Sequence, residues 1–274
     1  MVGFKPSFGV IPRTGVLKTC DTLDTIGWMT RSVADANLLL QALRVRSINY
    51  PMVERGFASS AQRFAGKTKW RVGLAKAPGH ENVTEDSRHK IEELALQLGN
   101  RPDVEIVELD LTEQLATAHA THETIYDRSL AYYFQRELSQ QKFISPIFQE
   151  IVERAKSISS EMYFKALEEQ EKLTRAVDSV MHKTDILILP STAGEAVAVD
   201  GKEPRDSSLI WTLTGAPAIS LPILKGPNGL PVGVTFVAAK YADDQLLEFA
   251  AKVMPGVAEI AVPLAAQGKS RKTA

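Results

Sequence analysis

Short runs of apolar residues predict the strands of a sheet. Strands are predicted over residues 70–75 and 104–109, and residues 104–109 alternate strongly between apolar and polar positions. Between them, residues 84–99 carry apolar positions at helical spacing, with one face formed by Ile91, Leu94, Ala95 and Leu98. A strand, a helix and a second strand in this order predict a parallel βαβ unit with a right-handed crossover.

The last third of the chain predicts a buried strand and a hairpin. Residues 185–190, Asp-Ile-Leu-Ile-Leu-Pro, hold four consecutive apolar residues, which is typical of a central parallel strand covered on both faces. Residues 218–222 and 232–237 predict two more strands. The turn residues at 225–229, Lys-Gly-Pro-Asn-Gly, predict that these two strands form a hairpin.

Helical spacing predicts further helices along the rest of the chain. In the first, over 32–44, Ser32 and Asp35 have the spacing of a capping box. The other helices are expected over 111–138, 146–183, 207–214 and 243–254, with Ser207 capping the third of these four. Three segments are expected to be irregular: a polar surface excursion over 45–67, a loop over 191–206 and a tail over 265–274.

These elements predict an α/β fold in which a mixed, largely parallel sheet is flanked by helices. A chain of 274 residues can bury the core of one large domain or of two smaller ones. No internal repeat or low-complexity block divides the sequence, and we expect a single domain over 1–274.

Charge argues against nucleic acid as a direct partner. The chain has 32 basic and 33 acidic residues and a formal net charge of −1, so it has no basic excess to hold a phosphate backbone. The one dense basic run, at 269–274, is interpreted as a solvated tail.

Cysteine use and the lack of long apolar runs predict a soluble, cytoplasmic protein. The single cysteine, Cys20, allows no disulfide within the chain, and its neighbours offer no base, so we interpret it as a structural thiol. The first residues have no apolar core of a signal peptide, and no run approaches the roughly 18–20 apolar residues that span a bilayer, so no membrane partner is expected.

Several motifs near the two ends of the chain are specific. The first block reads Gly-Phe-Lys-Pro-Ser-Phe-Gly over 3–9, followed by Leu-Asp-Thr-Ile-Gly over 23–27 and by Arg31, Val33, Asp35 and Ala36. The second block comprises the strand at 185–190, Thr-Gly-Ala-Pro-Ala-Ile-Ser-Leu-Pro over 214–222, Gly-Leu-Pro-Val-Gly over 229–233 and Asp-Gln-Leu-Leu over 244–247. In residue type, order and spacing these motifs resemble the amidase signature family.

The resemblance implies a fold, a reaction and an origin for the chain. Amidase signature enzymes hydrolyse carboxamide C–N bonds through an acyl-serine, using a Ser, a second Ser in a cis peptide and a Lys, with no metal or cofactor. In the family those residues precede the block at 3–9. We therefore expect this chain to be the C-terminal part of an amidase signature domain with an incomplete N-terminal half, and to be catalytically inactive alone.

The resemblance also implies substrate-binding residues. In relatives, the segment before the closing Thr-Gly-x-Pro motif lines the acyl or leaving-group side of the pocket, which here implicates Asp206, Ser208, Trp211 and Thr212. Trp211 would offer a flat apolar wall with one hydrogen-bond donor, or would belong to the core. Trp28 and Tyr126 are weaker candidates for the pocket.

Other groups with the right chemistry are expected to be structural. Lys5 belongs to a motif that is structural in the family, and Ser207 and Ser208 lack a glycine-rich anion hole. His119 and His122 are three residues apart and could share a metal, but no third ligand is evident, so a solvated helix face is favoured.

The sequence leaves three hypotheses for the function. The chain is a portion of an amidase that acts on a small-molecule amide. Alternatively, it is a non-catalytic binding or scaffold protein, or one half of a split amidase, whose uncovered edge needs an N-terminal half or self-association. A third hypothesis is an A-type component of a tRNA-dependent amidotransferase, which is disfavoured by the neutral charge and by departures from the usual family residues near Thr212. Other departures occur at Trp28, Thr235 and Gln170. These departures indicate either a changed substrate choice or relaxed constraint on a non-catalytic copy.

Overall fold

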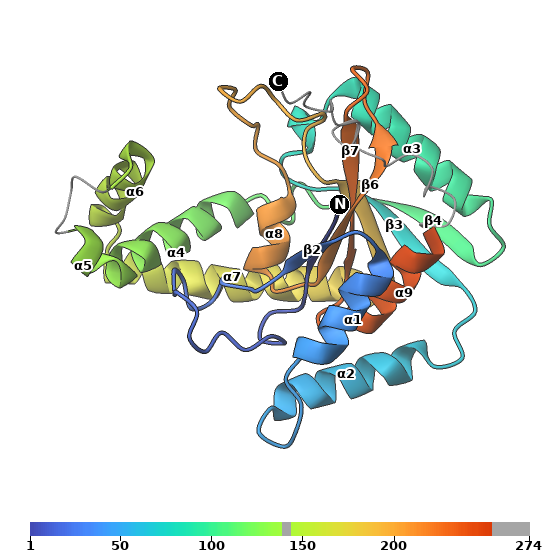
Figure 1. Ribbon diagram of the computed structural model, residues 1–274, viewed down its shortest axis with the longest axis horizontal. Helices are drawn as coiled ribbons and strands as arrows, with labels where there is room; N and C mark the ends of the chain where they lie inside the picture. Colours follow the sequence, from blue (N-terminus) through green and yellow to red (C-terminus); the bar gives the residue numbers. More distant parts are fainter. Residues whose placement is uncertain (139–143, 254–274) are drawn as a thin grey trace, which may run out of the picture.

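A seven-stranded mixed sheet forms the centre of the computed structural model, which describes residues 1–138 and 144–253 (Figure 1). The strand order is β2-β1-β6-β7-β5-β3-β4. The strands are β1 (Val2–Lys5), β2 (Trp28–Thr30), β3 (Trp70–Lys76), β4 (Val104–Asp110), β5 (Ile186–Pro190), β6 (Ala218–Lys225) and β7 (Pro231–Ala238).

The expected βαβ unit and hairpin are both confirmed. β3 and β4 pair in parallel, and β6 and β7 form the antiparallel hairpin. The sheet as a whole is less parallel than expected, because only the pairings of β3 with β4 and with β5 are parallel among the described strands. β5 is central, as predicted, but its other neighbour, β7, is antiparallel to it.

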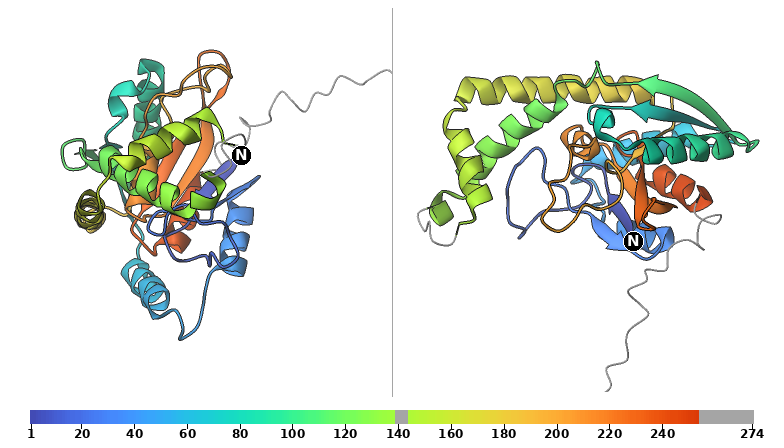
Figure 2. Two further views of the ribbon diagram at one scale, coloured as in Figure 1. Left: turned by 90° about the vertical axis from the view of Figure 1, so that its left-hand side faces the viewer. Right: turned by 90° about the horizontal axis from the view of Figure 1, so that it is seen from above.

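Helices cover both faces of the sheet (Figure 2). One face packs against α1 (Val33–Leu43), α3 (Glu85–Gly99) and α9 (Asp243–Val253), and the other against α4 (Ala118–Tyr133), α7 (Ser160–Met181) and α8 (Ser208–Leu213). Alternate side chains of β5 pack in the two cores on opposite faces of the sheet. Ile186 and Ile188 belong to the first core and Leu187 and Leu189 to the second, so every residue of the run is buried.

The long helices predicted over 111–138 and 146–183 are each divided. α4 starts only at Ala118 and is followed by the short α5 (Gln135–Leu138). α6 (Pro146–Lys156) and α7 are separate helices because Ser159 has extended backbone and its side chain caps α7, accepting a hydrogen bond from the Met162 N–H at 3.1 Å. The cap at Ser32 is confirmed, since its Oγ accepts from the Asp35 N–H at 3.1 Å.

The segment predicted to be an irregular excursion contains a helix, α2 (Pro51–Phe64). It does lie at the surface, and most of its residues are exposed. Val53, Phe57 and Phe64 pack on the first core. Their spacing of four and seven residues is helical, and it is hidden in the sequence by the polar residues around it.

A buried carboxylate attaches α2 to the sheet. Asp185, which is 2% exposed, accepts a hydrogen bond from Lys67 Nζ at 2.6 Å and one from the Arg71 N–H at 2.7 Å. Arg63 of α2 lies 3.5 Å from the same carboxylate and also donates to the carbonyl of Thr184. The start of β5 therefore serves as the anchor of a surface helix.

No helix in residues 1–138 and 144–253 is long and apolar enough to cross a membrane. The predicted tail over 265–274, with its basic run, lies outside the described residues. Cys20 is fully buried, and its Sγ lies 3.4 Å from Ser129 Oγ, as expected for a structural thiol.

Candidate functional site

A cavity of about 670 Å³ lies on the α8 face of the sheet. Strand alternation creates its floor: Phe4 of β1 turns into the first core, whereas Gly3 and Lys5 face the cavity. The cavity is bounded by β2 and by α8, and the lining side chains with polar atoms are Lys5, Trp28, Ser208, Trp211, Thr212, Ser220 and Thr235. Three of the four residues predicted to bind substrate therefore meet here.

Asp206 does not line this cavity, and its carboxylate caps α8. Its Oδ1 accepts hydrogen bonds from the N–H and the Oγ of Ser208, the first at 2.8 Å, which caps the N-terminus of α8. The predicted cap, Ser207, makes no capping hydrogen bond because its backbone is already helical. The Asp206 carboxylate thus orients the hydroxyl of Ser208, which lines the cavity.

Trp211 is both a core residue and a wall of the cavity. Its side chain is 1% exposed and packs in the second core, yet it lines the cavity. The indole Nε1 is buried and has no hydrogen-bond partner in the described structure. A buried donor without a partner costs about 1–3 kcal/mol, so a ligand carbonyl that accepted this hydrogen bond would recover that energy.

Lys5 is held by backbone carbonyls and not by a serine. Its Nζ donates to the carbonyls of Pro6, at 3.2 Å, and Ala216. Burial lowers the pKa of Lys5 to about 8, although the charge of Asp243 acts in the opposite direction. The lysine therefore fixes the junction between β1 and the start of β6, which agrees with its predicted structural role.

Three hydroxyls gather at the edge of the cavity that β6 and β7 form. Ser191 Oγ lies 2.7 Å from Ser220 Oγ and 2.8 Å from Thr235 Oγ1. Ser220 and Thr235 are directly opposite each other in the hairpin. Sequence reasoning missed Ser191 and Ser220. The available signal was the predicted hairpin, which brings residue 220 beside residue 235, a position already noted as unusual.

Of the two weaker candidates for the pocket, Trp28 lines the cavity and Tyr126 does not. Trp28 lines the cavity, donates from Nε1 to the Ala36 carbonyl at 3.2 Å and packs on Phe4. Tyr126 is not among the lining residues; it stacks on His122 with ring centroids 5.8 Å apart.

The histidines of α4 are less exposed than predicted. His119 Nε2 lies 2.8 Å from the Asp206 carbonyl oxygen, which ties α4 to the segment before α8. Burial lowers the pKa of His122. Within the described ranges, no three His, Cys, Asp or Glu side chains are grouped as metal ligands.

The family model for amidases matches residues 1–247. The chain belongs to the amidase family. This amidase-family chain is 26% identical over 285 residues to the A subunit of the glutamyl-tRNA(Gln) amidotransferase of Helicobacter hepaticus, covering 91% of the chain and 62% of that protein. It is 24% identical over 294 residues to the corresponding mitochondrial protein of Homo sapiens, covering 91% of the chain and 54% of that protein.

Solved structures show the same fold. A crystal structure of an amidase matches with a TM-score of 0.74 at 21% identity, covering 93% of this chain and 58% of that one. A bacterial aryl acylamidase of the amidase signature family matches with a TM-score of 0.72 at 15% identity, again covering 93% and 58%. The amidase-family chain thus spans between about half and two-thirds of the relatives it matches.

Proposed function

We propose that this chain supplies one wall of the substrate site of an amidase that cleaves a carboxamide C–N bond through an acyl-serine. The observation that carries the proposal is the unpartnered Nε1 of Trp211 beside a cavity of about 670 Å³. In this proposal the indole ring forms the apolar wall and its N–H binds the amide carbonyl or a neighbouring acceptor of the substrate.

The nucleophile and base of this reaction are proposed to come from residues other than these 274. Lys5 and Ser208 are the groups at the cavity that most resemble a base and a nucleophile, but Lys5 donates to carbonyls and Ser208 donates to Asp206. The proposed reaction needs a serine hydroxyl that donates to the lysine base through a second serine, and Ser208 and Lys5 have no such connection to each other. The chain alone is therefore expected to turn over amides about 10⁶-fold more slowly than an intact enzyme.

An N-terminal half carrying those residues is the proposed partner. It would cover β2, which is an edge strand with one neighbour, and Met29, whose side chain is 74% exposed in that strand. We place this assembly in the cytoplasm, which suits a single buried thiol at Cys20. Without the partner, the alternative is a non-catalytic binding protein that uses the same cavity.

The names of its relatives favour a second candidate, a component of a tRNA-dependent amidotransferase. Proteins so named from Helicobacter hepaticus and Homo sapiens align over 91% of this chain. In that case the nitrogen of the cleaved amide would be transferred to glutamyl-tRNA(Gln). Amide hydrolysis that is stimulated by glutamyl-tRNA(Gln) would separate this candidate from the first.

A reconstitution assay tests the main proposal. The purified chain is assayed on a panel of fluorogenic amides, alone and with an N-terminal amidase fragment that carries the Gly/Ser block. We expect turnover only in the mixture, and labelling of the fragment's serine by a fluorophosphonate. Trp211→Phe should raise KM about two- to tenfold in the mixture, the effect of losing one neutral hydrogen bond.

Two outcomes would contradict the proposal. Turnover by the chain alone that is lost in Ser208→Ala would place the nucleophile inside these residues. Turnover in the mixture that is unchanged by both Trp211→Phe and Thr212→Ala would remove this cavity from the substrate site. Leu230→Ala, at an exposed position outside the cavity, is the matched control.

A further inference from the structure

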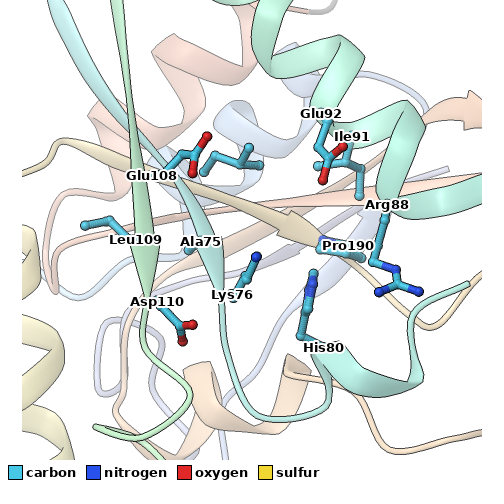
Figure 3. Close-up of a pocket in the computed structure, with 11 residues that line it drawn as sticks. Ala75, Lys76, His80, Arg88, Ile91, Glu92, Glu108, Leu109, Asp110 and Pro190 are labelled. Carbon is cyan, nitrogen blue, oxygen red and sulfur yellow. The ribbon is translucent and has the colours of Figure 1, made fainter. Parts of the chain in front are cut away.

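A second cavity lies on the opposite face of the sheet, next to α3. It has a volume of about 300 Å³ and opens where β3 and β4 end (Figure 3). It shares no lining residue with the cavity beside α8. We call it the α3 crevice, defined by Leu74, Lys76, His80, Arg88, Glu92 and Glu108.

The charged residues of the α3 crevice form two levels. In the parallel pairing, Lys76 is opposite Asp110, and Leu74 is opposite Glu108 two residues earlier. Two residues along a strand correspond to about 6.6 Å. On α3, Arg88 and Glu92 are four residues apart and share a face, so Glu92 lies one turn further along the helix than Arg88.

The two levels differ in charge, because Glu92 and Glu108 lie at one, whereas Lys76 and Arg88 outnumber the single carboxylate of Asp110 at the other. Figure 3 shows Glu92 and Glu108 toward one end of the crevice, with His80, Arg88 and the Lys76 ammonium toward the other. Leu74, Ile91 and Pro190 add apolar surface between the charged groups. The crevice is therefore polarised along its length, with an apolar lining.

Its charged groups have no partners of their own. Lys76, Arg88, Glu92 and Glu108 form neither a side-chain hydrogen bond nor an ion pair with any described residue. Other charged residues of α3 differ in this respect, since Lys90 pairs with Asp86 and His89 with Glu93. Unpaired charges gathered around one cavity are what a charged ligand would compensate.

Asp110 and His80 are the other two polar residues that line this cavity. Asp110 accepts hydrogen bonds from the N–H and the Oγ1 of Thr112 and keeps its negative charge, so Lys76 and Arg88 together leave an excess of one positive charge at this level. His80 Nδ1 is buried without a partner. Burial, with help from Lys76 and Arg88, lowers the pKa of His80, so the ring is neutral at pH 7 and one nitrogen can donate to an anion.

The position of the α3 crevice in the sheet suits a ligand site. β3 lies between β4 and β5. The chain leaves β3 through α3 on one face, and it leaves β4 through α4 to α7, with α4 and α7 on the other face (Figure 2). In open α/β sheets, ligands bind outside the carboxyl ends of parallel strands at such a reversal of direction.

We propose that the α3 crevice binds a small zwitterion, with its carboxylate on Lys76, His80 and Arg88 and its ammonium group on Glu92 and Glu108. The two levels are about 6.6 Å apart, which suits a skeleton of a few carbon atoms. This site is independent of the cavity beside α8, so it does not rest on the proposed amidase function.

Calorimetric titration of the purified full chain tests the proposal. The probes are glycine, β-alanine and 4-aminobutyrate, with butyrate and butylamine as the matching single-charge compounds. We expect saturable binding of at least one zwitterion with a Kd of about 1 mM or lower, and at least tenfold weaker binding of both single-charge compounds. Because this comparison uses the unaltered chain, it does not depend on any variant folding.

Variants locate the binding. Arg88→Gln and Glu108→Gln should each weaken the zwitterion about tenfold or more, the effect of losing a hydrogen bond to a charged group. Arg71→Gln and Glu93→Gln are matched controls, since both residues lie outside the crevice and pair with other side chains. The controls should bind as the unaltered chain does, and Trp211→Phe should leave the Kd unchanged.

Three results would overturn the proposal. Butyrate binding as tightly as 4-aminobutyrate would make this an anion site with no ammonium end. An absence of saturable binding for all three zwitterions up to about 10 mM would leave the crevice without this ligand class. Equal losses in the control variants and in the crevice variants would place the binding elsewhere on the chain.

Discussion

Asp243 accepts two hydrogen bonds from Ser7, one from its main-chain N–H at 2.7 Å and one from its Oγ at 2.6 Å. Asp243 is fully buried at the start of α9. The Ser7 hydroxyl in turn accepts from the Tyr241 N–H at 2.7 Å, so the three residues form one closed network. This network joins segments that are 236 residues apart in the sequence.

The first prediction concerns the pH dependence of stability at Asp243. Burial raises its pKa from 3.8 to about 6, so between these values the folded chain binds more protons than the unfolded chain. The contribution of Asp243 to the free energy of unfolding is therefore largest below about pH 4 and falls as the pH rises through 6. Asp243→Asn should lack this fall, which urea unfolding at pH 4, 5, 6 and 7 would measure. An identical pH slope in the two proteins would contradict the raised pKa.

The second prediction concerns the effect of Lys5 on stability at alkaline pH. Burial lowers its pKa from 10.5 to about 8, so between these values the unfolded chain binds more protons than the folded one. The contribution of Lys5 to stability is therefore smallest at neutral pH and rises from about pH 8 to about pH 10.5. Lys5→Met should remove this rise in urea unfolding. A variant that keeps the full rise would show that other groups cause it.

Gly27 should tolerate no side chain. A Cβ at this position would lie 2.6 Å from the carbonyl oxygen of Phe4, a backbone atom of β1. Gly27→Ala should therefore push β1 away from the segment before β2 and cost about 1–3 kcal/mol in the free energy of unfolding. Gly3→Ala is the matched control, because a Cβ at Gly3 meets nothing within 4 Å. Equal stability of the two variants would contradict this account.

Removing the carboxylate of Asp185 should release α2. Lys67 and Arg63 are both about 30% exposed and can be solvated, so Asp185→Ala should cost about 1–3 kcal/mol, less than the loss of a fully buried pair. Limited proteolysis should cut first within Pro51–Phe64. Glu105→Gln, which removes an exposed partner of Lys69 and Arg71, should change stability by less than about 0.5 kcal/mol.

The last prediction concerns the effect of Trp211 on the stability of the fold. Trp211→Phe removes the unpartnered Nε1 while keeping an aromatic ring, so the loss of packing is partly offset by removing a buried donor. We expect a net change within about 1.5 kcal/mol, whereas Trp211→Ala should cost about 3–5 kcal/mol. A large loss of stability in the Phe variant, measured by urea unfolding, would show that Nε1 has a partner in solution.

Local patterns in the sequence were sufficient for most of the strands and for the βαβ unit. The four apolar residues of β5 and the alternation in β4 are properties of adjacent residues, and both predictions were correct. α2 was missed because only Val53, Phe57 and Phe64 mark its buried face. The break before α7 depends on one capping residue, Ser159, within a continuous helical pattern.

The candidate pocket was predictable only in part. Ser208, Trp211 and Thr212 lie close together on α8, and the resemblance to the amidase signature family implicated them as one segment. Ser191 and Ser220 join them only because β5, β7 and β6 are neighbours, which is a fact of tertiary structure. The same holds for the α3 crevice, whose charged groups come from three separate elements and show no pattern in the sequence.

The place of β1 in the sheet has a consequence for how the chain folds. β1 pairs with β2 on one side and with β6 on the other, so one of its two neighbours lies more than 200 residues further along the chain. Forming the pairing with β6 closes a loop of more than 200 residues, a step that slows folding and must wait for synthesis of the hairpin. β1 can pair with the nearby β2 at once, but its other edge stays open until β6 is in place, so this side of the sheet is completed late in folding.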